Sequence, residues 1–194
     1  MKLLRKHKII AISVLAAAAI IITTVAASGG FDSQVNEDSK TANNVDFGAS
    51  AVEDGKTYSL PEMLTYAIQD EYLAHAEYER IIDDFGDQRP FINIIKAEEE
   101  HISTLEPLFA EYDVTIPENN ATDYITVPGS LLEANASGVE AEIKNIAMYE
   151  VFLGQDLPDD VRAVFTSLKN ASENHLSAFE KGVERLGGSI SGNT

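Results

Sequence analysis

The chain has 194 residues, a net charge of −18 and no cysteine. The lack of cysteine excludes disulfides and a lipoprotein anchor. The acidic balance argues against nucleic acid as a partner, because phosphate binding needs a basic face. A charge of this kind is typical of a well-solvated surface, and it also favours the accumulation of cations.

The first 27 residues are typical of a secretory signal. Basic residues precede an uncharged, almost wholly apolar run from Ile9 to Ala27, and Val25-Ala26-Ala27 offers small residues suited to signal peptidase. The run is also close to the roughly 20 residues that span a bilayer, so an uncleaved membrane anchor is an equal alternative. Both alternatives predict that the rest of the chain lies outside the cytoplasmic membrane, secreted or anchored. The membrane is expected as a partner only through this segment.

The remaining chain divides into three parts by composition. Residues 28–56 are rich in small and polar residues and have no apolar period, which predicts a flexible polar linker. The folded part is expected over 57–187, which is long enough for one core. Residues 188–194 form a polar tail.

Two helices are expected in the first half of the folded part. The first opens with the capping-box pattern Ser59-Leu60-Pro61-Glu62, and Gly86 ends it. The second starts at Asp87 with Pro90 in its first turn. Pro107 lies late in this helix, where it should kink or shorten it.

A long crossover over 113–130 separates this pair from a second pair of helices. The third helix is expected to be capped by Ser137–Glu140 and closed by Gly154, with a short turn at 131–136 before it. The fourth is expected over 156–187. The predicted fold is therefore all-α: a four-helix bundle of two helical hairpins joined by a long crossover.

One polar pattern occurs twice on the apolar faces of these helices. In each copy a glutamate precedes a Tyr-Glu pair, and a histidine follows on the next helix. The first copy comprises Glu71, Tyr78, Glu79 and Glu98–His101, and the second comprises Glu142, Tyr149, Glu150 and Ser172–His175. A carboxylate on one helix with a carboxylate and an imidazole on the next, given twice, is how a four-helix bundle builds a metal centre.

Helical spacing places five ionisable side chains in the middle of apolar stripes, whereas Glu99, Glu100 and Glu173 point outward. Buried charges normally pair or bind metal, and two imidazoles cannot neutralise three carboxylates as a pair of divalent cations can. Carboxylate with imidazole suits iron or manganese, of which one or two ions are expected, and zinc is a further candidate. The alternative is a polar core in which these groups pair with each other, with water or with nearby tyrosines. The five candidate ligands are Glu71, Glu98, His101, Glu142 and His175.

Five other polar residues lie close to this set. His75 falls on the rim of its stripe and is expected at the surface, although it is the natural candidate to supply the ligand that Ser172 lacks. Asn145 occupies a position one helical turn along and is expected as a weak ligand or as a hydrogen-bond partner of one. Tyr78 and Tyr149 are expected as core filling or as hydrogen-bond partners of the ligands.

Three glycosylation sequons begin at Asn120, Asn135 and Asn170. If the source organism glycosylates its surface proteins, the first two are expected to be the sites. The third lies within a predicted helix and places Ser172 on the inward face, so we discount it.

With these motifs the chain resembles the ferritin-like superfamily, and within it a family of uncharacterised archaeal and bacterial proteins known as a domain of unknown function. The resemblance covers about 57–187. It rests on Asp70–Ala74 through Tyr78, on Pro90–Ile94 through Glu98-x2-His101, and on Ala171–Phe179. The first two segments are also similar to helix signatures of rubrerythrin-type proteins.

The resemblance implies a di-metal carboxylate site. In it, one ion is held by Glu71 and His101, the other by Glu142 and His175, and Glu98 bridges them. The full superfamily pattern has a second bridging glutamate where this chain has Ser172, so water, hydroxide or a small anion would have to fill the gap. The four-cysteine domain of rubrerythrins is absent, so this chain has no built-in electron donor.

Three functions are consistent with these features. The first is an extracytoplasmic oxidoreductase whose two metals act on oxygen, peroxide or Fe²⁺. The second is a non-catalytic surface bundle in which metal is a structural element, and the third is a metal-free interaction module. The serine at 172 weighs against the first, and the inward-facing ligands weigh against the third. No catalytic residue and no oligomeric state is assigned.

Overall fold

The computed structural model describes residues 47–189. They form four α-helices and two short 3-10 turns, and this part of the chain contains no strand. The elements are η1 (Gly48–Ala51), α1 (Leu60–Phe85), α2 (Phe91–Glu111), η2 (Ala121–Asp123), α3 (Leu131–Leu153) and α4 (Asp159–Arg185). The all-α four-helix bundle is thereby confirmed. The expected signal segment, most of the expected linker and the last five residues lie outside the described residues.

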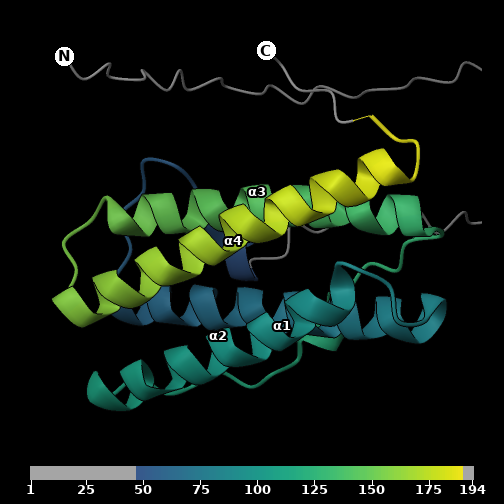
Figure 1. The fold of residues 1–194 in the computed structure, drawn as a ribbon. Coiled ribbons are helices and arrows are strands. Elements are labelled where there is room, and N and C mark those ends of the chain that lie inside the picture. Colours follow the sequence, from purple (N-terminus) through teal and green to yellow (C-terminus); the bar gives the residue numbers. More distant parts are fainter. Residues whose placement is uncertain (1–46, 190–194) are drawn as a thin grey trace, which may run out of the picture. The chain divides into compact units, whose positions relative to one another are not determined.

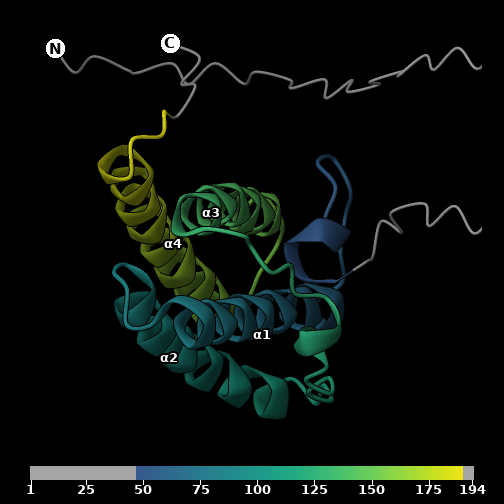
Figure 2. The same ribbon diagram turned by 90° about the vertical axis from the view of Figure 1, so that its right-hand side faces the viewer.

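The helices pair as two hairpins that lie in two layers (Figure 1). α1 packs along α2 and α3 packs along α4, while α1 also contacts α3 and α2 contacts α4. Figure 2 shows the same layers from the side, with the α3–α4 pair above the α1–α2 pair. No described helix is both long and apolar enough to be a candidate membrane span.

Two hydrogen bonds show the direction of α1 relative to α3. Glu71 on α1 is bonded to Tyr149 on α3, and Tyr78 on α1 is bonded to Glu142 on α3. The earlier residue of each helix thus meets the later residue of the other, so the two helices are antiparallel. Because each hairpin is also antiparallel, α2 and α3 run in the same direction. The link between them, residues 112–130, must therefore travel the length of the bundle, as expected for a crossover.

α1 follows its sequence signals closely. The backbone N–H of Ser59 donates to Glu62 Oε2 at 2.7 Å, which confirms the capping box. Gly86 ends the helix with φ at 76°, a conformation that residues with a Cβ rarely adopt. The apolar stripe is buried as predicted, including Leu64, Ala67, Ile68, Tyr78 and Ile81.

α2 begins four residues later than expected, at Phe91 instead of Asp87. The residue before a proline is disfavoured in the helical region, so the helix starts only after Pro90, which is its N-cap. Pro107 lies inside α2, and the helix runs a further turn beyond it, so the expected shortening does not occur. The carbonyl that loses its N–H partner belongs to Ser103, an exposed residue whose carbonyl water can reach.

α3 begins earlier than expected. Its N-cap is Ser130, whose Oγ accepts the backbone N–H of Glu133 at 3.2 Å. The prediction of a separate turn over 131–136 and a cap at Ser137 is therefore wrong. Ser130-Leu131-Leu132-Glu133 is itself a capping pattern and was the overlooked signal. The predicted close of this helix at Gly154 is confirmed.

Small residues allow α3 and α4 to approach closely. A Cβ at Gly138 would lie within 2.7–2.9 Å of the ring of Phe179, and a Cβ at Gly182 would overlap Asn135 Oδ1. Asn135 is consequently only 1% exposed, so its side chain is too buried for the glycosylation site that was expected there. Asn120 is partly exposed in the crossover.

The last ten residues of the expected linker, 47–56, are described, and the first of them pack onto the bundle. Phe47 is buried and stacks on Tyr124 of the crossover, with ring centroids 4.3 Å apart. The backbone N–H of Ala49 donates to Asp70 Oδ1 at 2.7 Å. The prediction of a flexible linker is therefore wrong for this stretch, because a few apolar and aromatic side chains in it are enough to hold it in place.

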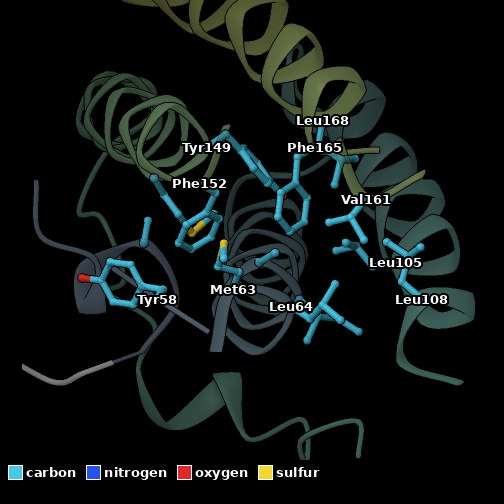
Figure 3. Packing of buried hydrophobic residues seen from close by; sticks show 14 of the residues in the cluster. Tyr58, Met63, Leu64, Leu105, Leu108, Tyr149, Phe152, Val161, Phe165 and Leu168 are labelled. Atoms are coloured by element: carbon cyan, nitrogen blue, oxygen red, sulfur yellow. The ribbon is translucent and has the colours of Figure 1, made fainter. Parts of the chain in front are cut away.

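The core consists of two apolar clusters. The larger cluster joins all four helices and η1, and Figure 3 shows its packing around Leu64, Leu105, Tyr149, Phe152, Phe165 and Leu168. The second cluster lies further along the bundle and includes Tyr78, Ile81, Phe91, Ile94, Phe179 and Val183. Along α2, α3 and α4, the sequence positions between the two clusters hold the polar residues of the candidate site. On α1, Glu71 lies beside Tyr72, the last buried residue of the larger cluster on this helix.

Candidate metal centre

All five predicted ligands converge between the apolar clusters. Their three carboxylates are 2–4% exposed, and their two imidazoles are nearly as buried. Glu99, Glu100 and Glu173 are exposed, as helical spacing predicted. The converging residues are Glu71 from α1, Glu98 and His101 from α2, Glu142 from α3 and His175 from α4.

The five side chains form two triads that share one residue. The triads are Glu71–Glu98–His101 and Glu98–Glu142–His175, and the ligand atoms within each lie within 4.8 Å of one another. Glu98 Oε2 lies 2.9 Å from His101 Nδ1, whereas Glu98 Oε1 lies 3.2 Å from His175 Nδ1. Each triad is completed by a second carboxylate, with Glu71 Oε2 at 3.0 Å from His101 Nδ1 and Glu142 Oε1 at 3.5 Å from His175 Nδ1. Glu98 thus offers a separate oxygen to each triad.

The donor set and its spacing fit a metal ion. Carboxylate and imidazole ligands lie about 2.0–2.2 Å from an ion such as zinc, so two ligands of one ion are roughly 3–4 Å apart. The measured separations fall in or near this range and also suit hydrogen bonds from protonated imidazoles. The charges favour a cation, because two imidazolium groups leave three carboxylates incompletely neutralised. These groups could therefore hold a metal ion.

The carboxylates of Glu71 and Glu142 each accept a hydrogen bond from a tyrosine on the facing helix. Tyr149 on α3 donates to Glu71 Oε1 at 2.8 Å, and Tyr78 on α1 donates to Glu142 Oε1 at 3.2 Å. Glu71 therefore uses Oε1 toward the tyrosine and Oε2 toward its histidine. The tyrosines are both core residues and hydrogen-bond partners of the candidate ligands, and such bonds orient ligands toward an ion.

Burial and neighbouring charge redistribute protons within the site. Burial, followed by the charge of Glu98, raises the pKa of Glu71, and burial raises the pKa of Glu142 to about 7. Burial opposes ionisation of Glu98, but hydrogen bonds from both histidines outweigh it and lower its pKa. Burial disfavours the charged imidazoles, yet hydrogen bonds to the carboxylates raise the pKa of His101 to about 10 and of His175 to about 9. Without metal, the site keeps protons at neutral pH that a cation would displace.

A chain of hydrogen bonds begins where the resemblance implies a second bridging glutamate. Ser172 is 3% exposed, and its hydroxyl donates to Asn145 Oδ1 at 2.6 Å. Asn145 Nδ2 donates in turn to Asp70 Oδ2 at 2.6 Å, and Asp70 accepts the N–H of Ala49. Asn145 thus joins the core to η1.

Asp70 is the polar residue of this region that our sequence reasoning did not assign to the site. It directly precedes Glu71, so helical geometry turns it by about 100° away from the centre of the stripe. Its hydrogen bonds come from α3 and from η1, and no periodicity within α1 signals either contact.

A cavity of about 20 Å³ adjoins the site and has room for about one water molecule. All three glutamates of the triads line it, but neither histidine does. The imidazoles therefore do not face this cavity. The remaining lining includes Asp70, Tyr78, Asn145 and Ser172.

His75 lies outside both triads. Its side chain is 27% exposed, and its Nε2 is 3.5 Å from Oε1 of the exposed Glu99. It is a surface residue, as helical spacing predicted. It does not join either triad, so in this structure it does not supply the ligand that Ser172 lacks.

Comparisons with known proteins agree with the fold. A search of the curated proteins finds no significant match. The crystal structure of a hypothetical protein from Methanococcus jannaschii DSM 2661 is similar with a TM-score of 0.61, over 72% of this chain and 89% of that chain. Their sequence identity is 20%, so this likeness shows a shared fold alone. The family model for an uncharacterised protein domain, DUF2202, matches residues 61–193, which include all four helices except Leu60, and the chain therefore belongs to the DUF2202 family.

Proposed function

We propose that this protein is a ferritin-like di-metal carboxylate protein that binds two divalent ions, iron or manganese, in the bundle core. The observation that carries the proposal is the position of Glu98 in both triads, with a separate oxygen toward each histidine. A carboxylate arranged in this way suits a bridge between two ions. The repeated pattern of a glutamate on one helix and Glu-x-x-His on the next is the donor set of such sites, reduced here by one glutamate.

Each ion would have its own terminal ligands. One would be bound by Glu71 and His101 and the other by Glu142 and His175, with Glu98 shared. Both histidines would bind through Nδ1, the ring nitrogen that faces the carboxylates. Two divalent ions would offset the three buried carboxylates, and the partly buried Asp70 lies close enough to offset the remaining charge.

Redox chemistry on oxygen, peroxide or Fe²⁺ is the reaction class that we propose for the loaded site, since iron and manganese supply such chemistry when bound. The cavity beside the three glutamates supports it. This cavity lies where Ser172 stands in place of a carboxylate, and it has room for about one small molecule. A metal that serves only as a structural element is the alternative. The N-terminal sequence supports an extracytoplasmic location.

Elemental analysis of the full chain tests metal binding. The protein is purified without chelator or a metal-affinity tag, beside Glu98→Gln and Glu99→Gln. The two variants lose the same charge on the same helix, but only the first loses a candidate ligand. We expect about two iron or manganese ions per chain in the parent and in Glu99→Gln, and loss of most metal in a folded Glu98→Gln. Equal metal in both variants, or none in a folded parent, would support the paired polar core instead.

Oxygen and peroxide consumption by the loaded protein then separates the two roles of the metal. Turnover beyond the amount of bound metal would support the oxidoreductase. A structural metal would give no turnover, and its removal would only lower the melting temperature.

A further inference from the structure

A second, larger cavity lies next to the one at the triads. It has a volume of about 310 Å³ and is formed mainly by α1 and α3. Asp70 on α1 and Ala141 on α3 line both cavities. Because these two residues belong to both linings, the two cavities are adjacent and only Asp70 and Ala141 are common to them. The inner cavity is lined by all three glutamates of the candidate site.

The outer cavity is shaped by segments that are held in fixed positions. Glu77 on α1 accepts the backbone N–H of Thr126 in the crossover at 3.3 Å. The 3-10 turn η1 is held by Asp70, and a Cβ at Gly48 would lie 2.6 Å from Asp70 Oδ1, so only glycine allows this close approach. The N-terminal segment and the crossover therefore both contribute walls beside Asp70.

The cavity is lined by three acidic side chains and one basic side chain, a balance that suits a cation. Asp70, Glu77 and Glu140 line it, with Lys144 as the basic residue among them. Each oxygen of Asp70 accepts one hydrogen bond: Oδ1 from the N–H of Ala49 and Oδ2 from Asn145 Nδ2. These bonds fix the carboxylate at the junction of the two cavities. Each carboxylate oxygen can accept a second contact, so a passing cation can still bind there.

The histidine side of the site lines neither cavity. The rings of His101 and His175 stack with centroids 5.6 Å apart, and their side chains are only 12% and 11% exposed. Their Nδ1 atoms point toward the carboxylates. A cation approaching from that side would have to displace the imidazoles, which are themselves ligands in the proposed site.

We propose that the α1–α3 cavity is the path by which divalent cations reach the two triads from solvent, with Asp70 as the positioning residue at its junction. This proposal rests on the proposed metal binding. It assigns a role to a carboxylate outside the ligand set and to a surface formed by η1 and the crossover.

The rate of metal uptake tests the path separately from metal binding. Metal-free full-length protein is mixed with Co²⁺, and the absorbance of the bound ion is followed in time, together with the final metal content. The variants are Asp70→Asn and the double variant Glu77→Gln/Glu140→Gln. Glu99→Gln/Glu100→Gln is the control, because it removes the same two charges from an exposed face of α2.

We expect uptake to slow about tenfold or more in the cavity variants relative to the control, because charge lining a cleft raises the local cation concentration. The final metal content should not change in the Glu77/Glu140 double variant, whose residues lie outside the inner cavity. Ala141→Phe should also slow uptake without any change of charge, since it narrows the junction. Asp70→Asn also alters a hydrogen-bond chain, and the Glu77/Glu140 and Ala141 variants leave that chain intact.

The outcomes distinguish the two proposals. Normal uptake in Ala141→Phe and in the double variant, in a protein that binds metal, would overturn the path and leave metal binding standing. A parent that binds no Co²⁺ would overturn the metal site itself and the path with it. Slow uptake with reduced final content in the double variant would also contradict the path, because it would identify these residues as ligands.

Discussion

Tyr149 donates a hydrogen bond of 2.8 Å to Glu71 from the facing helix, and both side chains are buried. Tyr78 makes the equivalent bond to Glu142 in the opposite direction. The two halves of the bundle thus hold each other's carboxylates. This exchange follows from the repeated Glu-x6-Tyr spacing, because two antiparallel helices with the same seven-residue separation place each tyrosine opposite the other helix's glutamate.

Replacing Tyr149 by Phe should therefore affect both stability and metal binding. Loss of this buried hydrogen bond leaves a carboxyl oxygen of Glu71 without its partner, which lowers the free energy of unfolding by about 1–3 kcal/mol. A misoriented Glu71 should weaken metal affinity by about 10–100-fold. Urea denaturation and metal titration measure the two effects.

Tyr112→Phe is the matched control for this variant, since its hydroxyl donates to Asp160 at 2.6 Å on the exposed surface. We expect a smaller loss of stability and no change in metal affinity. Equal metal affinities in the two variants would contradict a role for Tyr149 in orienting Glu71.

The metal-free protein should lose stability as pH rises. The pKa of Glu142 is raised from 4.5 to about 7, so its contribution is complete below pH 4.5 and is lost by about pH 7. The pKa values of His101 and His175 are raised from 6.5 to about 10 and about 9, so their contributions are lost as pH rises through that range. Metal binding should have the opposite dependence, because the ligands must release protons.

Urea denaturation of the metal-free protein between pH 5 and pH 10 checks this prediction, with Glu142→Gln as the control. The variant should lack the part of the slope below about pH 7, where Glu142 titrates. Identical slopes in parent and variant would show that the pH dependence arises elsewhere in this acidic protein.

Ser172→Glu should strengthen metal binding. It supplies a carboxylate beside the cavity that the three glutamates line, at the position where the repeated pattern lacks one. It also breaks the hydrogen bond to Asn145, so stability without metal should fall. Metal titration of Ser172→Gln, which has a similar shape without the charge, isolates the effect of the carboxylate. Equal affinities in the two variants would contradict this assignment.

Gly138→Ala should destabilise the second apolar cluster. The new methyl group would lie within 2.7–2.9 Å of the Phe179 ring, which is fully buried against Phe91 and Tyr78. Overpacking of this kind costs about 1–3 kcal/mol, more than the gain of up to about 1 kcal/mol in helix propensity. Thermal unfolding measures the effect, and Ser167→Ala on the exposed face of α4 is the control. A higher melting temperature for Gly138→Ala would contradict the observed packing.

The inward orientation of the candidate ligands could be predicted from the sequence because it depends only on the helical period. Glu71, Glu98 and His175 each fall among apolar residues spaced three or four apart, and all three are buried. The same period explains why Glu99 and Glu173 are exposed. The helix ends at Ser59 and Gly86 were predictable for a similar reason, since caps are local.

The parts of the site that depend on tertiary contacts could not be predicted. Asp70 is turned away from the apolar stripe of α1, and it bonds to η1 through the N–H of Ala49. The polar composition of residues 28–56 predicted a flexible linker there, so this contact was not expected. The early start of α3 was not predicted because Ser137-Gly138-Val139-Glu140 is also a capping pattern. In the structure Gly138 lies inside α3 and leaves space for Phe179 from another helix, which no local pattern of α3 signals.

Anomalous X-ray diffraction from crystals of the metal-loaded protein, collected at the absorption edge of the bound element, tests the central claim most directly. Two-metal sites have ions about 3.5–4 Å apart. We expect two peaks at about this separation, one beside Glu71 and His101 and the other beside Glu142 and His175, with Glu98 between them. Peaks only at surface carboxylates, with none at these five residues, would contradict the account.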